Sequence, residues 1–212
     1  MPTDAIFWVV VLVFSVILHE VAHGYMANYL GDPTAKLQGR LTLNPISHID
    51  LFGSIILPAL IVLTTPFPPI GYAKPVPYNP HYIKQKNGEA LVAFAGPGTN
   101  ILIALAFGLS IRFFGTSLNS DLIHAFSAIA LINTSLAIFN LIPIPPFDGS
   151  KVISALLPGP LRVGYESMRY SFERMGFLGN LFVIFILMTV FGSFFSTFVL
   201  SVFALIAGRG YL

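Results

Sequence analysis

Four long apolar stretches, separated by polar or proline-rich segments, dominate the pattern of hydrophobic positions along the chain. They cover residues 5–30, 89–114, 122–142 and 180–207. A helix needs about 20 mainly apolar residues to cross the hydrocarbon core of a bilayer, and each stretch is long enough. The pattern therefore predicts four transmembrane helices.

Four shorter segments have patterns of their own. Residues 51–65 are apolar but short, and a proline interrupts them, which indicates a short or re-entrant element. Residues 66–80 hold too many prolines for a helix and should be extended. Non-helical backbone at membrane depth is tolerated only where it is buried in protein or lines a water-filled cavity, so we expect this segment to line the active-site cleft. Residues 34–45 alternate partly, which predicts a β-hairpin or other extended insertion. Residues 161–175 mix charged and apolar positions, as an amphipathic surface helix does.

Composition supports a membrane protein and narrows its chemistry. The chain is 55% hydrophobic and only 9% charged, whereas soluble domains carry about 25% charged residues. The net charge of +2 and the lack of a basic run argue against a nucleic-acid partner. Cysteine is absent, which excludes thiolate ligands and a cysteine nucleophile. We predict a single domain over residues 1–212, all-α and polytopic, with a small membrane-dipping β-type insertion.

The first apolar stretch also carries polar residues of an HExxH pattern, namely His19, Glu20 and His23. On a helix, two residues four apart leave the same face about one turn apart. Two imidazoles in that arrangement suit a zinc ion, and the glutamate between them suits a general base. Such polar side chains are costly inside a membrane span, so they indicate a functional site by default. The structural alternative is a polar cluster satisfied by other helices.

A catalytic zinc site usually takes three protein ligands and leaves one position open. No third histidine follows at the metzincin spacing, so the third ligand has to come from a distant part of the chain. Asp148 follows an apolar span and helix-breaking prolines, and it precedes a glycine. We therefore predict that His19, His23 and Asp148 bind one Zn²⁺ per chain. An ordinary Asp-Gly turn at an interface is the structural alternative for Asp148.

Charge indicates which side of the membrane the site faces. If residues 51–80 enter and leave on one side, nine of the eleven Lys and Arg residues share the side of His23 and Asp148. A simple crossing by residues 51–65 gives a split of seven to four, and it places the two motifs at opposite faces. The positive-inside rule favours the first arrangement. We predict a multi-pass protein of the cell membrane whose active site opens toward the cytoplasm.

Three motifs follow one another along the chain: HEVAH at residues 19–23, GPGTN at residues 96–100 and NLIPIPPFDG at residues 140–149. Their order and spacing resemble the site-2 proteases, which are zinc-dependent intramembrane metalloproteases. The resemblance covers nearly the whole chain and is strongest to compact bacterial and archaeal members without PDZ or CBS domains. It implies peptide-bond hydrolysis in or near transmembrane segments of membrane-anchored proteins. It also implies the zinc ligands proposed above, with Glu20 as general base and later proton donor.

Further residues are candidates for positions around the zinc. Asn140 lies about two helical turns before Asp148, so it is a candidate to stabilise the oxyanion. Asn100 and His48 are further oxyanion or cleft candidates, although Asn100 also suits a hydrogen bond between helices and His48 suits a plain interface. The resemblance implies a substrate-pairing strand made of Gly71, Tyr72, Ala73 and Lys74.

The sequence thus predicts an intramembrane zinc endopeptidase. Its partners are a transmembrane protein or peptide substrate and the lipid bilayer, and its oligomeric state stays open. The alternative from another class is a metal-ion transporter that uses the same His, Glu and Asp cluster. A transporter needs ligands along a continuous path through several spans, whereas the candidates here gather near one face. That distribution favours the enzyme.

Overall fold

A computed structural model describes residues 2–50, 74–208 and 210. The chain forms two compact units, Met1–Gly88 and Glu89–Leu212. Each unit is described by itself below. The single domain over residues 1–212 stays a prediction.

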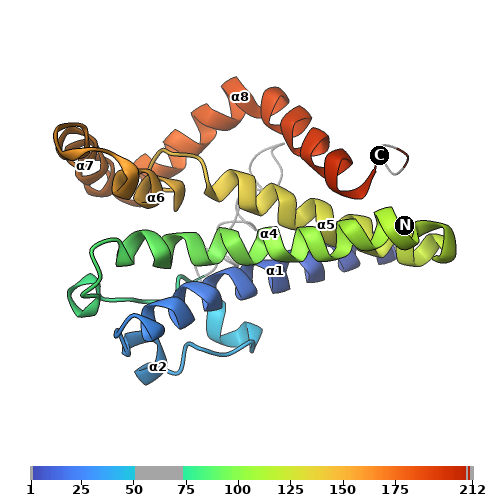
Figure 1. Cartoon of the computed structure of the whole chain (residues 1–212), viewed down its shortest axis with the longest axis horizontal. Coiled ribbons are helices and arrows are strands. Elements are labelled where there is room, and N and C mark those ends of the chain that lie inside the picture. Colours follow the sequence, from blue (N-terminus) through green and yellow to red (C-terminus); the bar gives the residue numbers. More distant parts are fainter. Residues whose placement is uncertain (1, 51–73, 209, 211–212) are drawn as a thin grey trace. The chain divides into compact units, whose positions relative to one another are not determined.

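Helices make up the regular structure of both units (Figure 1). The first unit contains α1 (Pro2–Tyr29), α2 (Thr34–Leu37) and the 3-10 turns η1 (Pro45–His48) and η3 (Pro80–Tyr82). The second unit is built from α4 (Gly88–Phe114), η4 (Gly115–Ser117), α5 (Ser120–Asn140), α6 (Gly149–Leu156), α7 (Gly159–Arg174) and α8 (Gly176–Ala207).

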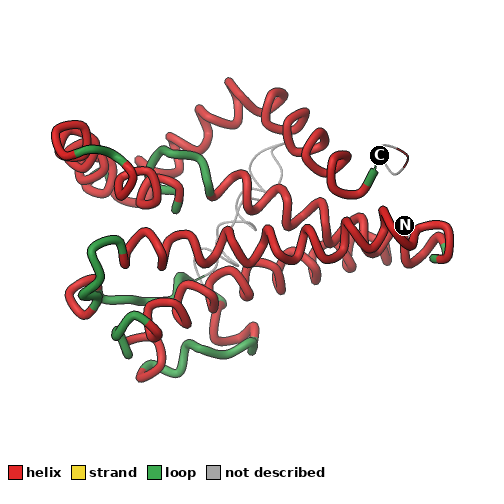
Figure 2. The backbone as a smooth tube through the Cα atoms, viewed as in Figure 1, coloured by secondary structure: helices red, strands yellow, loops and turns green. Residues whose placement is uncertain are grey.

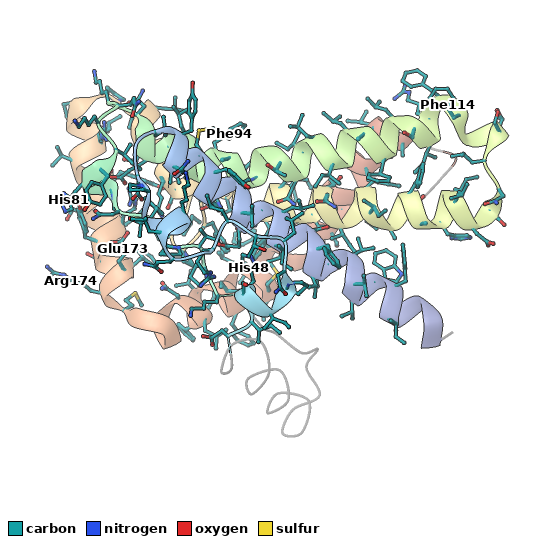
Figure 3. All side chains as sticks on the ribbon, turned by 90° about the horizontal axis from the view of Figure 1, so that it is seen from below. His48, His81, Phe94, Phe114, Glu173 and Arg174 are labelled. Carbon is teal, nitrogen blue, oxygen red and sulfur yellow. The ribbon has the colours of Figure 1, made fainter. Side chains whose placement is uncertain are left out.

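Four helices in the described part of the chain are long and apolar enough to cross a membrane. They run over Ala5–Tyr29, Gly88–Ser117, Ser120–Asn140 and Gly179–Ala207. The prediction of four transmembrane helices is therefore confirmed, and the protein is a multi-pass membrane protein. Helix α7 occupies the segment expected to be amphipathic, and the charged Glu173 and Arg174 side chains stand at its end (Figure 3).

The predicted β-type insertion is wrong for residues 34–45. Thr34–Leu37 is the helix α2, and Figure 2 shows helices and loops but no strand in the described residues. A local turn before the helix explains the difference, because the Asp32 carboxylate accepts a hydrogen bond from the Thr34 amide at 2.9 Å. Gly39, with φ of +65°, then ends the turn. These start and stop signals outweigh the weak alternation of the segment.

Two other expectations fall mainly outside the described residues. The short or re-entrant segment 51–65 lies wholly outside them, as do residues 66–73 of the expected cleft segment. The described remainder of that segment, residues 74–79, is a loop without helix or strand.

In the second unit, a buried polar pair joins α4 to α5. The Asn100 amide donates to the Asn133 side-chain oxygen at 2.8 Å, and both residues are fully buried. Helix α8 packs close to α4 at Gly108, where an added Cβ would lie 2.6 Å from a side-chain carbon of Ile206. A small apolar core of Ile111, Ala130, Phe203 and Ala207 lies nearby. These contacts fix α4, α5 and α8 as the frame from which the α5–α6 loop projects.

Candidate metal centre

The two histidines of α1 are arranged as a pair of metal ligands. Their Nε2 atoms are 3.0 Å apart, and the rings meet edge to face at an interplanar angle of 85°. Both side chains are buried, with 6% of His19 and 9% of His23 exposed. Two nitrogens on a tetrahedral zinc ion with Zn–N bonds of about 2.0–2.1 Å are about 3.3 Å apart. The pair therefore fits zinc by its donor type and by its spacing.

Glu20 lies between these histidines in sequence, and the first unit holds its carboxylate in place. Oε2 of Glu20 accepts a hydrogen bond from the main-chain amide of Val76 at 2.8 Å. This contact joins residues 56 positions apart. It fixes one carboxylate oxygen and so orients the side chain, while the role of Glu20 as general base stays a prediction.

Val76 belongs to residues 74–79, which we call the anchored segment because polar contacts hold it along its length. The Lys74 amide donates to the His48 carbonyl at 2.9 Å. Arg40 donates through Nη2 to the carbonyls of Lys74 and Pro75, at 2.8 Å and 3.3 Å. At the far end, the main-chain amide of Asn79 donates to the Asp32 carboxylate at 2.6 Å.

Close packing on α1 brings the anchored segment to Glu20. Gly24 lies one turn after Glu20, and a Cβ added there would be 2.7 Å from Cγ1 of Val76 and 2.6 Å from Cδ2 of Leu41. A larger residue at position 24 would thus push Val76 away from the helix. Sequence reasoning missed Gly24, Arg40 and Val76, because no local pattern reveals contacts between residues this far apart.

Asp32 ties the end of α1 to the anchored segment. It is fully buried. Burial alone would raise the pKa of its carboxyl, but hydrogen bonds from the Thr34 hydroxyl and from the main-chain amides of Asn79 and Thr34 hold that pKa below its ordinary value. The ionised carboxylate therefore accepts from both the α2 turn and the anchored segment.

His48, a predicted cleft candidate, lies on η1 (Figure 3). Only 2% of it is exposed, and its Nε2 lies 2.8 Å from the Thr42 carbonyl. Its Nδ1 is buried without a hydrogen-bond partner in the described part of the chain. Through its own carbonyl, His48 holds Lys74. The contacts give it a place in the support of the anchored segment, and its role as a cleft residue stays a prediction.

In the second unit, Asp148 stands at the start of α6, directly after the proline-rich loop that follows α5. Its carbonyl accepts from the amides of Lys151 at 2.9 Å and Val152 at 3.2 Å, which opens the helix. Gly149 presses this loop against the end of α5, because an added Cβ would lie 2.3 Å from the Leu141 carbonyl oxygen. The loop thus fixes the backbone of Asp148 relative to α5.

The two asparagine candidates of this unit have different surroundings. The Asn100 amide is engaged by Asn133 in the fully buried pair between α4 and α5. Asn140, at the end of α5, is half-buried and donates to the Leu136 carbonyl at 3.0 Å. The observed bond of Asn100 is the interhelical one, and the oxyanion role of Asn140 stays a prediction.

Comparison with known proteins identifies the family. The family description "Peptidase family M50" matches residues 108–187, which include Asp148. The Bacillus subtilis protein YwhC, named as a candidate zinc metalloprotease, is 38% identical over 165 residues, covering 73% of this chain and 70% of YwhC. The chain belongs to peptidase family M50, the site-2 proteases.

Other M50 relatives agree with this assignment. The candidate zinc metalloprotease Rip2 of Mycolicibacterium smegmatis is 29% identical, over 64% of this chain and 51% of Rip2. The zinc metalloprotease MJ0392 of Methanocaldococcus jannaschii is 27% identical, over 73% of this chain and 36% of that protein. No solved structure matches.

Membership in M50 confirms the predicted enzyme class. The protein is a zinc metalloendopeptidase of the site-2 type, and such a protease acts on membrane-protein substrates. The metal-transporter alternative is not favoured, because the relatives are named as metalloproteases.

Proposed function

We propose that His19, His23 and Asp148 bind the catalytic zinc ion, that Glu20 is the general base, and that the protein cleaves peptide bonds in or near transmembrane segments of membrane-anchored proteins. The observation that carries the proposal is the imidazole pair on α1, with its Nε2 atoms 3.0 Å apart and Glu20 held beside it by Val76. The M50 membership supports the third ligand, because the matched region includes Asp148.

The role proposed for each residue follows from the chemistry of its side chain. A zinc ion bound here supplies Lewis acidity, which lowers the pKa of a water molecule and polarises the scissile carbonyl. Glu20 takes the proton of the attacking water on Oε1 and later gives it to the leaving amine. Asn140 is our candidate donor for the oxyanion.

The substrate has to present an extended segment, because an amide inside a transmembrane helix is shielded by its own hydrogen bonds. Residues 71–74 are our candidates to pair with it through main-chain hydrogen bonds. The Lys74 amide and carbonyl are already engaged by His48 and Arg40. Within this proposal, pairing therefore falls to Gly71, Tyr72 and Ala73, which lie outside the described residues.

The test compares wild type with Glu20→Gln, reconstituted in lipid with a panel of single-span substrates, while bound zinc is quantified in both. We expect the variant to keep its zinc and to lose cleavage, because the amide cannot accept the proton. Glu89→Gln, the same chemical change at an exposed position in the first turn of α4, is the matched control and should cleave normally. Cleavage by Glu20→Gln at the wild-type rate would refute the mechanism.

We also propose that the site opens toward the cytoplasm, on the basis of the positive-inside rule. The chain has no cysteine, so single cysteines report topology without background. Arg174→Cys, on the side predicted to be cytoplasmic, should be protected from a membrane-impermeant maleimide in intact cells. Arg112→Cys, in the last turn of α4 and on the side predicted to be external, should react. The reverse pattern would overturn the orientation.

A further inference from the structure

Arg40 is an unusual residue in the first unit because it is a buried cation that has no acidic partner among the residues the structure describes. Only 8% of it is exposed, and no ion pair involves it among the described residues. Its Nη2 donates to the Lys74 and Pro75 carbonyls, while its Nε is buried without a hydrogen-bond partner in the same described residues. Burying a guanidinium in this way is costly. Its contacts therefore point to a task at the anchored segment.

The two carbonyls that Arg40 holds come directly before the amide that contacts Glu20. Lys74 and Pro75 precede Val76 in the chain, and the Val76 amide donates to Oε2 of Glu20 at 2.8 Å. The Pro75 carbonyl and the Val76 N–H belong to one planar peptide unit, so the direction of the first sets the direction of the second. Fixing the Lys74 and Pro75 carbonyls therefore fixes the direction in which the Val76 amide points.

We propose that Arg40 is a positioning residue for the catalytic base: by holding the Lys74 and Pro75 carbonyls, it aims the Val76 amide at Glu20 and so orients the carboxylate. This inference rests on the proposed role of Glu20. Arg40 touches neither the zinc ligands nor Glu20 in the described contacts, and it acts through Val76.

The consequence for catalysis is a loss of orientation when Arg40 is replaced. A free carboxylate side chain samples several rotamers, whereas a general base has to lie within hydrogen-bond reach of the proton it takes. Removing a supporting partner of this kind typically costs about 10–100-fold in activity. In this proposal Arg40 acts on Glu20 through the Val76 amide, and the Lys74 main chain that it holds is already engaged, so the loss falls on kcat.

The experiment measures kcat, KM and zinc content for Arg40→Met and Arg40→Lys in reconstituted protein. We expect Arg40→Met to lower kcat by about 10–100-fold with KM and zinc unchanged. Arg40→Lys should recover much of this loss, because only Nη2 makes the observed bonds and a lysine ammonium can replace a single donor nitrogen. A merely structural arginine would instead lower zinc content and stability, and kcat per zinc-loaded molecule would stay at the wild-type value.

A second variant tests the relay if Arg40→Met fails to fold. Replacing the Val76 amide with an ester removes the N–H that donates to Glu20, and kcat should fall by a similar factor. The same ester at Ile83 is the control, because the Ile83 N–H donates to the Pro80 carbonyl instead. Wild-type kcat in the Val76 ester and in Arg40→Met, with Glu20→Gln inactive, would overturn the positioning role alone. Wild-type cleavage by Glu20→Gln would instead overturn the proposed function.

Discussion

Gly149→Ala tests whether the α5–α6 loop positions Asp148. The added Cβ would lie 2.3 Å from the Leu141 carbonyl oxygen and 2.6 Å from that of Ile142, about 1 Å less than the 3.4 Å of ordinary contact. Both neighbours are main-chain atoms, which cannot turn away as a side chain does. Overpacking of this kind costs about 1–3 kcal/mol. Two main-chain contacts under 3.0 Å place the cost at about 2–3 kcal/mol, and alanine returns at most about 1 kcal/mol through its better helix propensity, so we expect a net loss of at least about 1 kcal/mol.

The displacement also bears on zinc. A ligand moved by more than a few tenths of an ångström no longer reaches the ion at its normal bond length. We expect Gly149→Ala to bind zinc at least about tenfold more weakly, measured by competition with a chelator alongside thermal unfolding in detergent. Gly159→Ala is the control, because Gly159 also opens a helix but a Cβ there meets nothing within 4 Å. Wild-type zinc affinity and stability in Gly149→Ala would refute the reasoning.

Three further predictions concern polar side chains. Because the pKa of Asp32 is lowered in the folded protein, its contribution to stability is present above about pH 4 and is lost as pH falls through the folded pKa. Thermal unfolding of Asp32→Asn, followed across acidic pH, should lack this dependence, and a pH profile of stability like that of wild type would contradict the prediction. Asn133→Ala should destabilise the protein by about 1 kcal/mol, because it removes the acceptor of the buried Asn100 amide; unchanged thermal unfolding would argue against the pair. Asn140→Ala should lower turnover and leave zinc content intact, and a loss of zinc or of folding would rule out its oxyanion role.

The sequence predicted the transmembrane helices well because their signal is strong and local. An apolar run of membrane length has few other solutions, and the helices of the second unit begin within a few residues of the expected positions. The expected β-hairpin was wrong because partial alternation over residues 34–45 is weak, and the turn that Asp32 makes with Thr34 favours the helix α2. The short helix α6 was not predicted, because eight residues directly after a proline-rich loop are too few for an apolar pattern to separate a helix from a loop.

The candidate site shows the same limit. His19, Glu20 and His23 carry their chemistry in a local motif, so their spacing alone indicated a metal site. Nothing in the sequence indicates that Arg40 holds the backbone next to Val76, because that contact depends on how the anchored segment returns to α1. Motif chemistry is readable from sequence, whereas the residues that orient it require the fold.

The central claim is that Asp148 completes the metal site begun by His19 and His23. The most direct test is Asp148→Cys loaded with Co²⁺, since a thiolate is a metal ligand and the chain has no other cysteine. We predict sulfur-to-cobalt charge-transfer absorption in this variant and none in Ser150→Cys, two residues further on. Cobalt bound to Asp148→Cys without that absorption would contradict the account, because residue 148 would then not reach the metal.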